Sequence, residues 1–205
     1  MNKPVINIKN LNVDYITDKN PIKAVRDVTF EIFSGEIFGL VGESGSGKST
    51  VVQAMMRILP PPAIISKGEV IINNEDILAS SSLDVVGMRW KKISIVMQSA
   101  LNALNPVLSI REQIHDVLKT HKNLIGLDAD ERAKELLSLV EIDHDRLDSF
   151  PHQLSGGMKQ RIVIAIALAI MPPIIIMDEP TTALDVIVER AVSYTHLTLP
   201  TNVAV

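Results

Sequence analysis

One stretch of eight residues constrains this chain more than any other. Residues 42–49 read GESGSGKS and match the pattern G-x-x-x-x-G-K-[ST] at every position. Residues 36–41 (EIFGLV) predict a strand before this stretch, and the sequence from Lys48 to about Leu59 predicts a helix after it, as a phosphate-binding loop requires. The expected nucleotide-binding residues are Gly42, Glu43, Ser44, Gly45, Ser46, Gly47, Lys48, Ser49 and Thr50.

Each residue type in this loop has a physical role. Glycines allow tight turns and a close approach of the backbone to phosphate. Backbone N–H groups at the start of the following helix attract an anion. Lys48 is expected to reach the β- and γ-phosphates, and Ser49 to place its hydroxyl on Mg²⁺. Because many unrelated nucleotide-using proteins share such a loop, the loop alone does not name a function.

The rest of the chain alternates predicted strands and helices. Strands are expected over residues 5–15, 24–33, 69–72, 93–97 and 174–177, and helices over residues 109–120, 129–141 and 158–171. This alternation indicates an α/β fold. The apolar run IIIM at 174–177 is typical of a parallel strand buried on both faces. The apolar stretch 162–177 is interrupted by Pro172-Pro173, so it is interpreted as a buried helix, a turn and a strand, not as a membrane span.

Two carboxylates follow the run IIIM directly. Asp178 and Glu179 are expected at the carboxyl end of a buried strand, beside the phosphate loop. Asp178 would hold Mg²⁺, and Glu179 would orient and deprotonate an attacking water. An exposed acidic turn before Pro180 is the simpler alternative for this segment taken alone.

Composition excludes several classes of site. The chain has no cysteine, which excludes a disulfide framework, a thiolate zinc site and a cysteine nucleophile. Its net charge of −4 shows no basic excess of the kind that indicates nucleic-acid binding. His115, His121 and His144 lie in polar segments and are interpreted as solvated surface residues, not as metal ligands.

Further motifs resemble those of the ATP-binding cassette (ABC) ATPases. Residues 154–161 read LSGGMKQR, about 105 residues after Lys48, and are similar to the signature sequence of that family. The family's other motifs have counterparts at Tyr15 (adenine-stacking aromatic), Gln98 (Q-loop), Asp178-Glu179 (Walker B) and Ala183-Leu184-Asp185 (D-loop). The resemblance implies a P-loop NTPase with a RecA-like parallel sheet, an N-terminal antiparallel β part and an α-helical signature subdomain. It places the nucleotide-binding domain at residues 1–191, with the core at about 1–98 and 172–191 and the helical subdomain at about 99–171.

The resemblance also implies a mechanism. In this family two cassettes enclose two ATP molecules head to tail, so Ser155, Gly156 and Gly157 of one copy would cap the γ-phosphate bound to the other. Asp185 would belong to the same nucleotide site. Gln98 would contact the Mg²⁺ and couple the nucleotide to a transmembrane partner. A simpler interpretation of Ser155 is that it caps its own helix.

Residues 98–106 (QSALNALNP), 152–161 and 178–186 are most similar to the ATPase subunits of dipeptide, oligopeptide and nickel importers. That resemblance implies a cassette at the cytoplasmic face of the membrane that uses ATP and Mg²⁺ to drive uptake of peptides, or of nickel or an oligosaccharide. Its implied partners are a second ATPase subunit, two permease subunits and, through them, an extracytoplasmic binding protein, with no nucleic acid. The alternatives are an inactive truncated fragment of such a subunit and a soluble ABC ATPase without a transport role.

Residues 192–205 do not fit the family pattern. The string VSYTHLTLPT at 192–201 matches the translation of a sequencing adapter, so we expect a non-native tail after about Arg190 and a cassette that is incomplete at its C-terminus. His196 lies only 18 residues beyond Asp178, with no strand expected before it, and is not expected to be the family's switch histidine. No cassette strand or helix is expected in residues 192–201.

Overall fold

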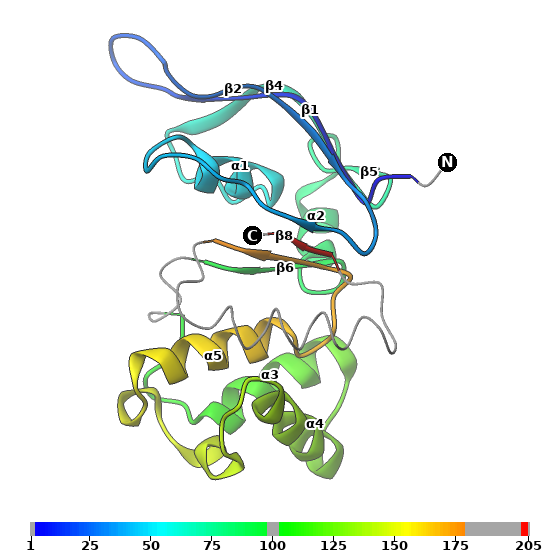
Figure 1. Ribbon diagram of the computed structural model, residues 1–205, viewed down its shortest axis with the longest axis vertical. Helices are drawn as coiled ribbons and strands as arrows, with labels where there is room; N and C mark the ends of the chain where they lie inside the picture. The colour runs from blue at the N-terminus through cyan, green and yellow to red at the C-terminus, as the bar shows by residue number, and fades with distance from the viewer. Residues whose placement is uncertain (1–2, 98–102, 179–201, 205) are drawn as a thin grey trace. The chain divides into compact units, whose positions relative to one another are not determined.

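The structure is a computed structural model that describes residues 3–97, 103–178 and 202–204 (Figure 1). The chain divides into two compact units. The first unit comprises residues 1–92 and 202–205, and the second comprises residues 93–201. The unit boundary groups the strand at residue 93 and the strand at residue 174 with the helices between them.

An antiparallel sheet with the strand order β2-β1-β4-β5 forms the first unit. These strands are β1 (Ile6–Tyr15), β2 (Ile22–Ile32), β4 (Ala63–Ile72) and β5 (Glu75–Asp76). Helix α1 (Lys48–Met55) contacts β1 and β2 (Figure 1). The antiparallel β part predicted for the N-terminal region is therefore present.

A β-bulge explains the spacing of the buried residues on β1. Ile6, Ile8, Leu11 and Val13 are all fully buried, although strict alternation would break between Ile8 and Leu11. The pairing with both neighbouring strands shifts register in this interval. Gly68 on β4, with φ +114°, faces the bulge, and a Cβ there would lie 2.6 Å from Leu11 Cα. The bulge restores the alternation, so one face of the strand stays buried along its length.

The remaining strands form two parallel pairs, and one of these pairs lies in the first unit. Strand β3 (Ile37–Phe38) pairs with β8 (Asn202–Ala204) in the first unit, and the Phe38 ring stacks on Phe30 with centroids 4.9 Å apart. Strand β3 is shorter than the predicted 36–41. Asn202–Ala204 thus provides a backbone partner for β3. Residues 192–201, in which no cassette strand or helix is expected, lie outside the described residues.

Helix α1 ends at Met55, four residues before the predicted Leu59. Arg57 adopts the left-handed conformation (φ 49°), which ends the helix. Helix α2 (Ser82–Met88) follows β5 and was not predicted; the Ser81 hydroxyl accepts a hydrogen bond from the Asp84 N–H at its start.

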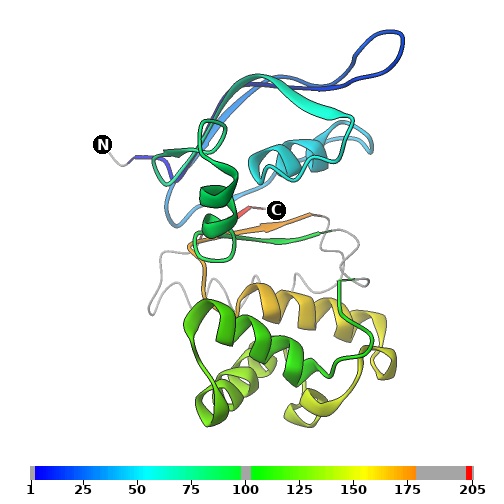
Figure 2. The same cartoon turned by 180° about the vertical axis from the view of Figure 1, so that it is seen from behind.

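The second unit contains a parallel strand pair and a group of helices. Strand β6 (Ile93–Val96) pairs with β7 (Ile174–Met177), whose four residues are all buried, as the run IIIM predicts. The helices are α3 (Ile110–Lys122), α4 (Gly126–Leu139) and α5 (Gly156–Ala167), with the 3₁₀ turns η2 (His144–Asp148) and η3 (Pro151–Gln153). Figure 2 shows α3 and α4 on the side of α5 away from the strand pair.

The apolar stretch 162–177 divides into the end of α5, a turn and β7, which confirms the interpretation from the sequence. Helix α5 ends at Ala167, earlier than the predicted residue 171. Across the described parts of the chain, no helix has both the length and the apolar character needed to cross a bilayer.

Charged groups hold the helices of the second unit together. Arg111 on α3 pairs with Asp130 on α4 and donates from Nε to Asp148 Oδ1 on η2 at 2.7 Å. This hydrogen bond raises the pKa of Arg111 and lowers the pKa of Asp148 below its usual value. One side chain therefore joins three elements of this unit.

Candidate functional site: a phosphate loop and a second glycine-flanked helix start

The predicted phosphate loop forms a compact turn between β3 and α1. The Ser46 N–H donates to the Glu43 carbonyl at 3.1 Å, and Gly45 lies inside this turn with φ +78°. A Cβ on Gly42 would lie 2.8 Å from Ser46 Oγ. Glu43, Ser44, Gly45 and Ser46 are exposed, so the turn is open to a ligand.

Gly47 makes the junction between the loop and α1. It is the N-cap of the helix with φ +93°, and a Cβ there would lie 2.7 Å from the Ala24 carbonyl oxygen of β2. Only glycine fits both demands. No side chain caps the helix, and no acidic residue lies in its first turn. The first N–H groups of α1 therefore keep their attraction for an anion.

Lys48 folds back over the loop. Its Nζ donates to the Gly42 carbonyl at 2.9 Å and to the Glu43 carbonyl at 2.8 Å. The ammonium thus lies at the first turn of the loop, at the uncapped end of α1. Ser49 and Thr50 follow in the first turn of the helix and are half-buried.

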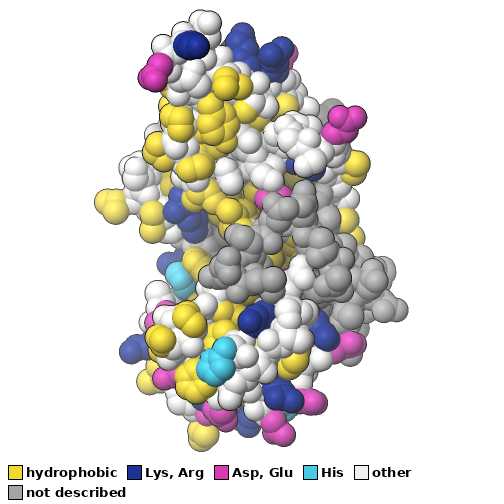
Figure 3. All heavy atoms as spheres, turned by 90° about the vertical axis from the view of Figure 1, so that its left-hand side faces the viewer, with side chains coloured by type: hydrophobic (Ala, Val, Ile, Leu, Met, Phe, Trp, Pro, Cys, Tyr) yellow, Lys and Arg dark blue, Asp and Glu magenta, His cyan; other side chains and the backbone are white. Residues whose placement is uncertain are grey.

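Tyr15 lies close to this loop along the antiparallel sheet. It ends β1 and pairs with Ile22 and Ala63. Ala24, which contacts Gly47, lies two residues from Ile22, or about 7 Å along the strand. Apolar side chains are exposed on the first unit, in the upper part of Figure 3. Ile16, Ile22 and Ile64, at this end of the sheet, are exposed. The strand pairing therefore puts an aromatic and apolar surface within reach of a nucleotide on the loop.

Asp178 directly follows β7. Its side chain is 9% exposed, and its N–H donates to the Val96 carbonyl of β6 at 2.9 Å, which extends the ladder by one step. Asp178 thus lies at the carboxyl end of the parallel pair, as predicted. Because Asp178 is buried, it does not belong to an exposed acidic turn, which was the alternative considered for this segment. Glu179, Gln98 and Asp185 lie outside the described residues.

The signature residues begin α5. Ser155 is its N-cap, and its hydroxyl accepts a hydrogen bond from the Met158 N–H at 3.3 Å, so Ser155 does cap its own helix. Gly156 and Gly157 are exposed, and a Cβ on either would have no neighbour within 4 Å. The first turn of α5 carries no acidic residue, a property it shares with α1.

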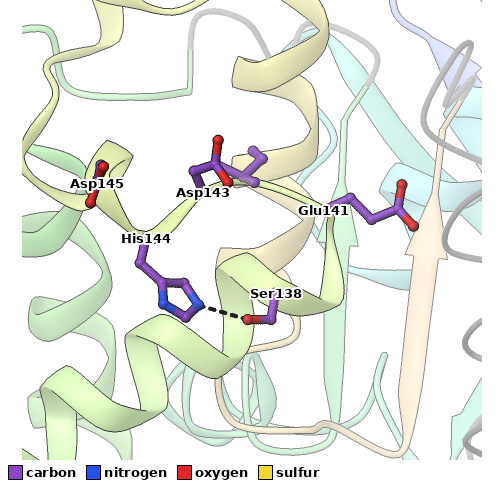
Figure 4. A pocket seen from close by; sticks show the side chains of 6 residues that line it. Ser138, Glu141, Asp143, His144 and Asp145 are labelled. Atoms are coloured by element: carbon purple, nitrogen blue, oxygen red, sulfur yellow. Dashed lines mark hydrogen bonds between the residues drawn. The ribbon is translucent and has the colours of Figure 1, made fainter.

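A separate hollow in the second unit carries acidic side chains. Ser138, Glu141, Ile142, Asp143, His144 and Asp145 line it (Figure 4). His144 Nε2 lies 2.7 Å from Ser138 Oγ, and Glu141 points away from the imidazole (Figure 4). Among the described residues, no group of three or more His, Cys, Asp or Glu side chains is arranged to hold a metal ion.

Comparison with known proteins identifies the family. The profile of the family described as "ABC transporter" matches residues 25–182. The chain belongs to the ABC transporter family. The match spans the phosphate loop, the signature and Asp178, so it confirms the resemblance indicated by LSGGMKQR.

Curated relatives of this ABC chain include peptide-transport proteins. It is 42% identical over 191 residues to the dipeptide transport ATP-binding protein DppD of Bacillus subtilis, and 40% identical over 191 residues to the oligopeptide transport ATP-binding protein OppD of the same organism. Each alignment covers 92% of this chain and 57% or 53% of the relative. The chain therefore spans about half the length of the curated relatives that it matches.

Solved ABC cassettes share the fold. The dimeric structure of MJ0796, a bacterial ABC transporter cassette, is 32% identical, with a TM-score of 0.86 and coverage of 97% of this chain and 86% of that one. A post-hydrolysis dimer of MJ0796 bound to ADP and Pi is 30% identical, with a TM-score of 0.84 and the same coverage. The predicted fold class, an ABC cassette of the P-loop type, is confirmed.

Two groups of side-chain hydrogen bonds to the backbone of this ABC chain were not predicted from the sequence. Arg57 and Arg89 hydrogen-bond the backbone around the end of α1, and Gln113 holds the loop before α3. No spacing rule marks these contacts, because each joins a side chain to carbonyl groups whose positions only the fold defines. The start of α3 did carry a signal: Ser109 and Glu112 form a capping box of the type S-x-x-E.

Proposed function

We propose that this chain is the ATP-binding and ATP-hydrolysing cassette of an importer for peptides, with nickel or an oligosaccharide as the other candidate cargoes. One observation carries the nucleotide site: α1 begins without a side-chain cap or an acidic residue, and Lys48 lies at that end of the helix. Such an arrangement binds a polyphosphate through backbone N–H groups and an ammonium. Tyr15 stacks on the adenine in this proposal.

Mg²⁺ is the metal that this residue set suits. The hydroxyl of Ser49, the carboxylate of Asp178 and the amide oxygen of Gln98 are oxygen ligands, which Mg²⁺ prefers together with substrate phosphates. When bound, Mg²⁺ offsets the charge of the phosphate oxygens. Asp178 supports this role because it is buried at the end of β7.

The proposed reaction is an in-line attack of water on the γ-phosphate. Glu179 accepts the proton of that water, Lys48 stabilises the phosphate oxygens, and Gln98 positions the water and the metal. Ser155, Gly156 and Gly157 cap the γ-phosphate held by a second subunit, and Asp185 lies near the subunit contact. Both glycines are exposed, and among the described residues none lies within 4 Å of a Cβ built at either, which supports a role toward another molecule.

The proposed partners follow from the relatives, which are named as peptide-transport ATP-binding proteins. They are a second ATPase subunit, identical or related, and two permease subunits, through which an extracytoplasmic binding protein delivers the cargo. The chain would then bind peripherally at the cytoplasmic face of the membrane. Nucleic acid is not a partner in this proposal.

The test is ATP binding and turnover by the 205-residue chain and by Glu179→Gln. We expect the unsubstituted chain to bind ATP. Where it turns over, the variant should bind ATP equally but hydrolyse it about 10²- to 10⁴-fold more slowly, because the amide cannot accept a proton. Glu131→Gln, which changes an exposed carboxylate on α4, outside the phosphate loop, is the matched control. An unsubstituted chain that binds no ATP contradicts the proposal, and a Glu179→Gln variant with full turnover moves the base elsewhere.

We also propose that residues 192–205 are a non-native tail. If they are, the alternative to an active importer subunit is an inactive, truncated fragment of one. The adapter-like string at 192–201 supports this proposal, whereas the pairing of β8 with β3 gives Asn202–Ala204 a structural contact. A chain that ends at Ala191 distinguishes a tail with no role from a tail whose strand β8 stabilises the first unit. Equal ATP affinity and equal Tm support a tail with no role, and a lower Tm with weaker binding shows that β8 stabilises the first unit.

A further inference from the structure

Arg89 makes an unusual contact with the helix that carries the phosphate site. Its Nη2 donates to the Met56 carbonyl at 3.0 Å and to the Arg57 carbonyl at 3.1 Å. These two carbonyls lie at the C-terminal end of α1, opposite the loop. Arg89 itself ends α2, so one guanidinium joins two helices of the first unit.

Two backbone hydrogen bonds already satisfy other carbonyls at that helix end. The Arg57 N–H donates to the Ala54 carbonyl at 3.0 Å, and the Ile58 N–H donates to the Gln53 carbonyl at 2.9 Å. This is the Schellman pattern of a helix C-terminus, formed here around a left-handed arginine in place of the usual glycine. The carbonyls that this pattern leaves over at Met56 and Arg57 are the two that Arg89 binds.

Arg57 adds a second link in the opposite direction. Its Nη1 donates to the Ile77 carbonyl at 3.1 Å and to the Ser80 carbonyl at 2.6 Å, in the segment between β5 and α2. The two arginines therefore fasten the end of α1 to residues 77–89 from both sides. Four hydrogen bonds to backbone carbonyls fix this end, so the helix can neither slide nor rotate without breaking several of them.

A short helix transmits such a constraint along its axis. Helix α1 has eight residues and is about 12 Å long, which is too short to bend appreciably. Its other end meets the phosphate at Gly47 and Lys48, where the N–H groups must point at the ligand. A shift at the C-terminal end therefore becomes a shift of the phosphate-binding N–H groups.

We propose that Arg89 is a positioning residue for the phosphate loop: by holding the C-terminal carbonyls of α1, it sets where the N-terminal end of that helix presents its N–H groups to the nucleotide. The inference rests on the proposed function, because it assumes that the loop binds ATP. Arg89 acts through geometry and not through its charge. The guanidinium is separated from the phosphate by about 12 Å, the length of α1, so it does not touch the nucleotide, and the salt dependence of the effect distinguishes geometry from charge.

The experiment measures ATP affinity of the 205-residue chain and of Arg89→Met, well below the Tm of either. We expect about five- to tenfold weaker binding in the variant, a fraction of what loss of a charged hydrogen bond costs. The weakening should be the same at 0.05 and 0.5 M salt. Hydrogen exchange of the Val51 N–H, which donates to the Gly47 carbonyl at 2.9 Å, should become faster.

Arg132→Met is the matched control in the second unit. Arg132 Nε donates to the Ala169 carbonyl at 3.3 Å, just after α5, and its Nη1 pairs with Glu135. Arg132→Met also removes an arginine that hydrogen-bonds a backbone carbonyl just after a helix, so it should lower Tm by a comparable amount. It should leave ATP affinity and the hydrogen exchange of the Val51 N–H unchanged.

The outcomes separate the two proposals. An unsubstituted chain that binds no ATP contradicts the proposed function. A chain that binds ATP, with Arg89→Met binding equally well, overturns the positioning role alone. A loss that disappears at 0.5 M salt also overturns it, in favour of a charge effect. If Arg89→Met does not fold, Arg89→Lys replaces it: we expect two- to threefold weaker binding, because a point cation cannot reproduce the planar guanidinium, and unchanged affinity with unchanged Val51 exchange overturns the role.

Discussion

Helices α1 and α5 both begin at glycines and carry no acid in their first turn, but the two starts differ in what holds them. Gly47 is required by the fold itself, because its φ is +93° and a Cβ would meet the Ala24 carbonyl. Gly156 and Gly157 have ordinary helical positions and no neighbour within 4 Å of a Cβ. The fold of the first unit requires Gly47, whereas the described residues give no steric reason for glycine at 156 or 157.

Helix α3 provides an internal reference for both. Its N-terminus is closed by Ser109 and Glu112, which satisfy each other's backbone groups in a capping box. A helix start that needs no ligand thus carries a carboxylate where α1 and α5 carry none. The comparison indicates that neither α1 nor α5 closes its first turn with a carboxylate, and that Lys48 folds back over the start of α1.

The largest expected effect tests that lysine. Lys48→Ala removes an ammonium that holds the Gly42 and Glu43 carbonyls and, in the proposed function, binds the phosphates, so ATP affinity should fall about 10²-fold, the size of a charged hydrogen bond or two. Lys159→Ala, in the first turns of α5, is the control and should leave ATP affinity of the chain unchanged. Equilibrium binding measures both, and equal affinities for the two variants would remove the difference between the helix starts.

The glycines should respond in opposite directions. Gly47→Ala forces a methyl group into a left-handed position against a carbonyl oxygen, which should lower the free energy of unfolding by about 1–3 kcal/mol. Gly157→Ala meets nothing and should raise it by up to about 1 kcal/mol, because alanine favours the helix.

Denaturant unfolding measures both glycine variants. Destabilisation by Gly157→Ala would show that the fold does need this glycine. In the full transporter assembly, the same stabilised variant should lose ATP hydrolysis if the glycine faces a nucleotide on the second subunit.

A smaller effect is expected at the cap of α5. Ser155→Ala removes the hydroxyl that accepts from the Met158 N–H and should cost about 1 kcal/mol of stability. Ser155→Gly should cost only a few tenths of a kcal/mol, since glycine is tolerated at this position. Thermal unfolding distinguishes the two. Equal losses would mean that Ser155 stabilises the unit through something other than capping.

The smallest effect is a pH dependence at α3. Hydrogen bonds from the Ser109 N–H and hydroxyl lower the pKa of Glu112 below its ordinary value of 4.5. A lowered pKa means that the contribution is fully present above the unfolded value and is lost as the pH falls through the folded value. The Tm difference between the unsubstituted chain and Glu112→Gln should therefore persist at pH 6 and shrink below about pH 4.5. A difference that is constant down to pH 3 would contradict this account.

Local patterns predicted much of this molecule. The phosphate loop and β7 each follow from a short run of residues whose chemistry is local: glycines with a lysine, and four apolar residues. The end of α1 was missed because Arg57 takes a left-handed conformation that its own sequence does not favour, and contacts from residues 77–89 hold it there. Helix α2 was missed because its seven residues carry too little periodicity to detect.

The site was predictable only as a set of separate pieces. The roles of Lys48 and Asp178 depend on the residues next to them, so motifs could place both at the ends of their elements. Arg89 acts on carbonyl groups more than thirty positions away in sequence, and no spacing rule covers such a contact.

The loop that leads into α3 has a mechanical consequence. Gln113 accepts from the Asn105 N–H at 2.9 Å and donates to the Asn105 and Leu108 carbonyls at 3.2 and 3.0 Å, which binds the loop to the helix that follows it. These hydrogen bonds therefore make residues 105–109 and α3 move together as one rigid piece. A push delivered at Asn105 is passed on as rotation of α3 and, through Arg111, of α4 and η2, instead of being absorbed where it arrives.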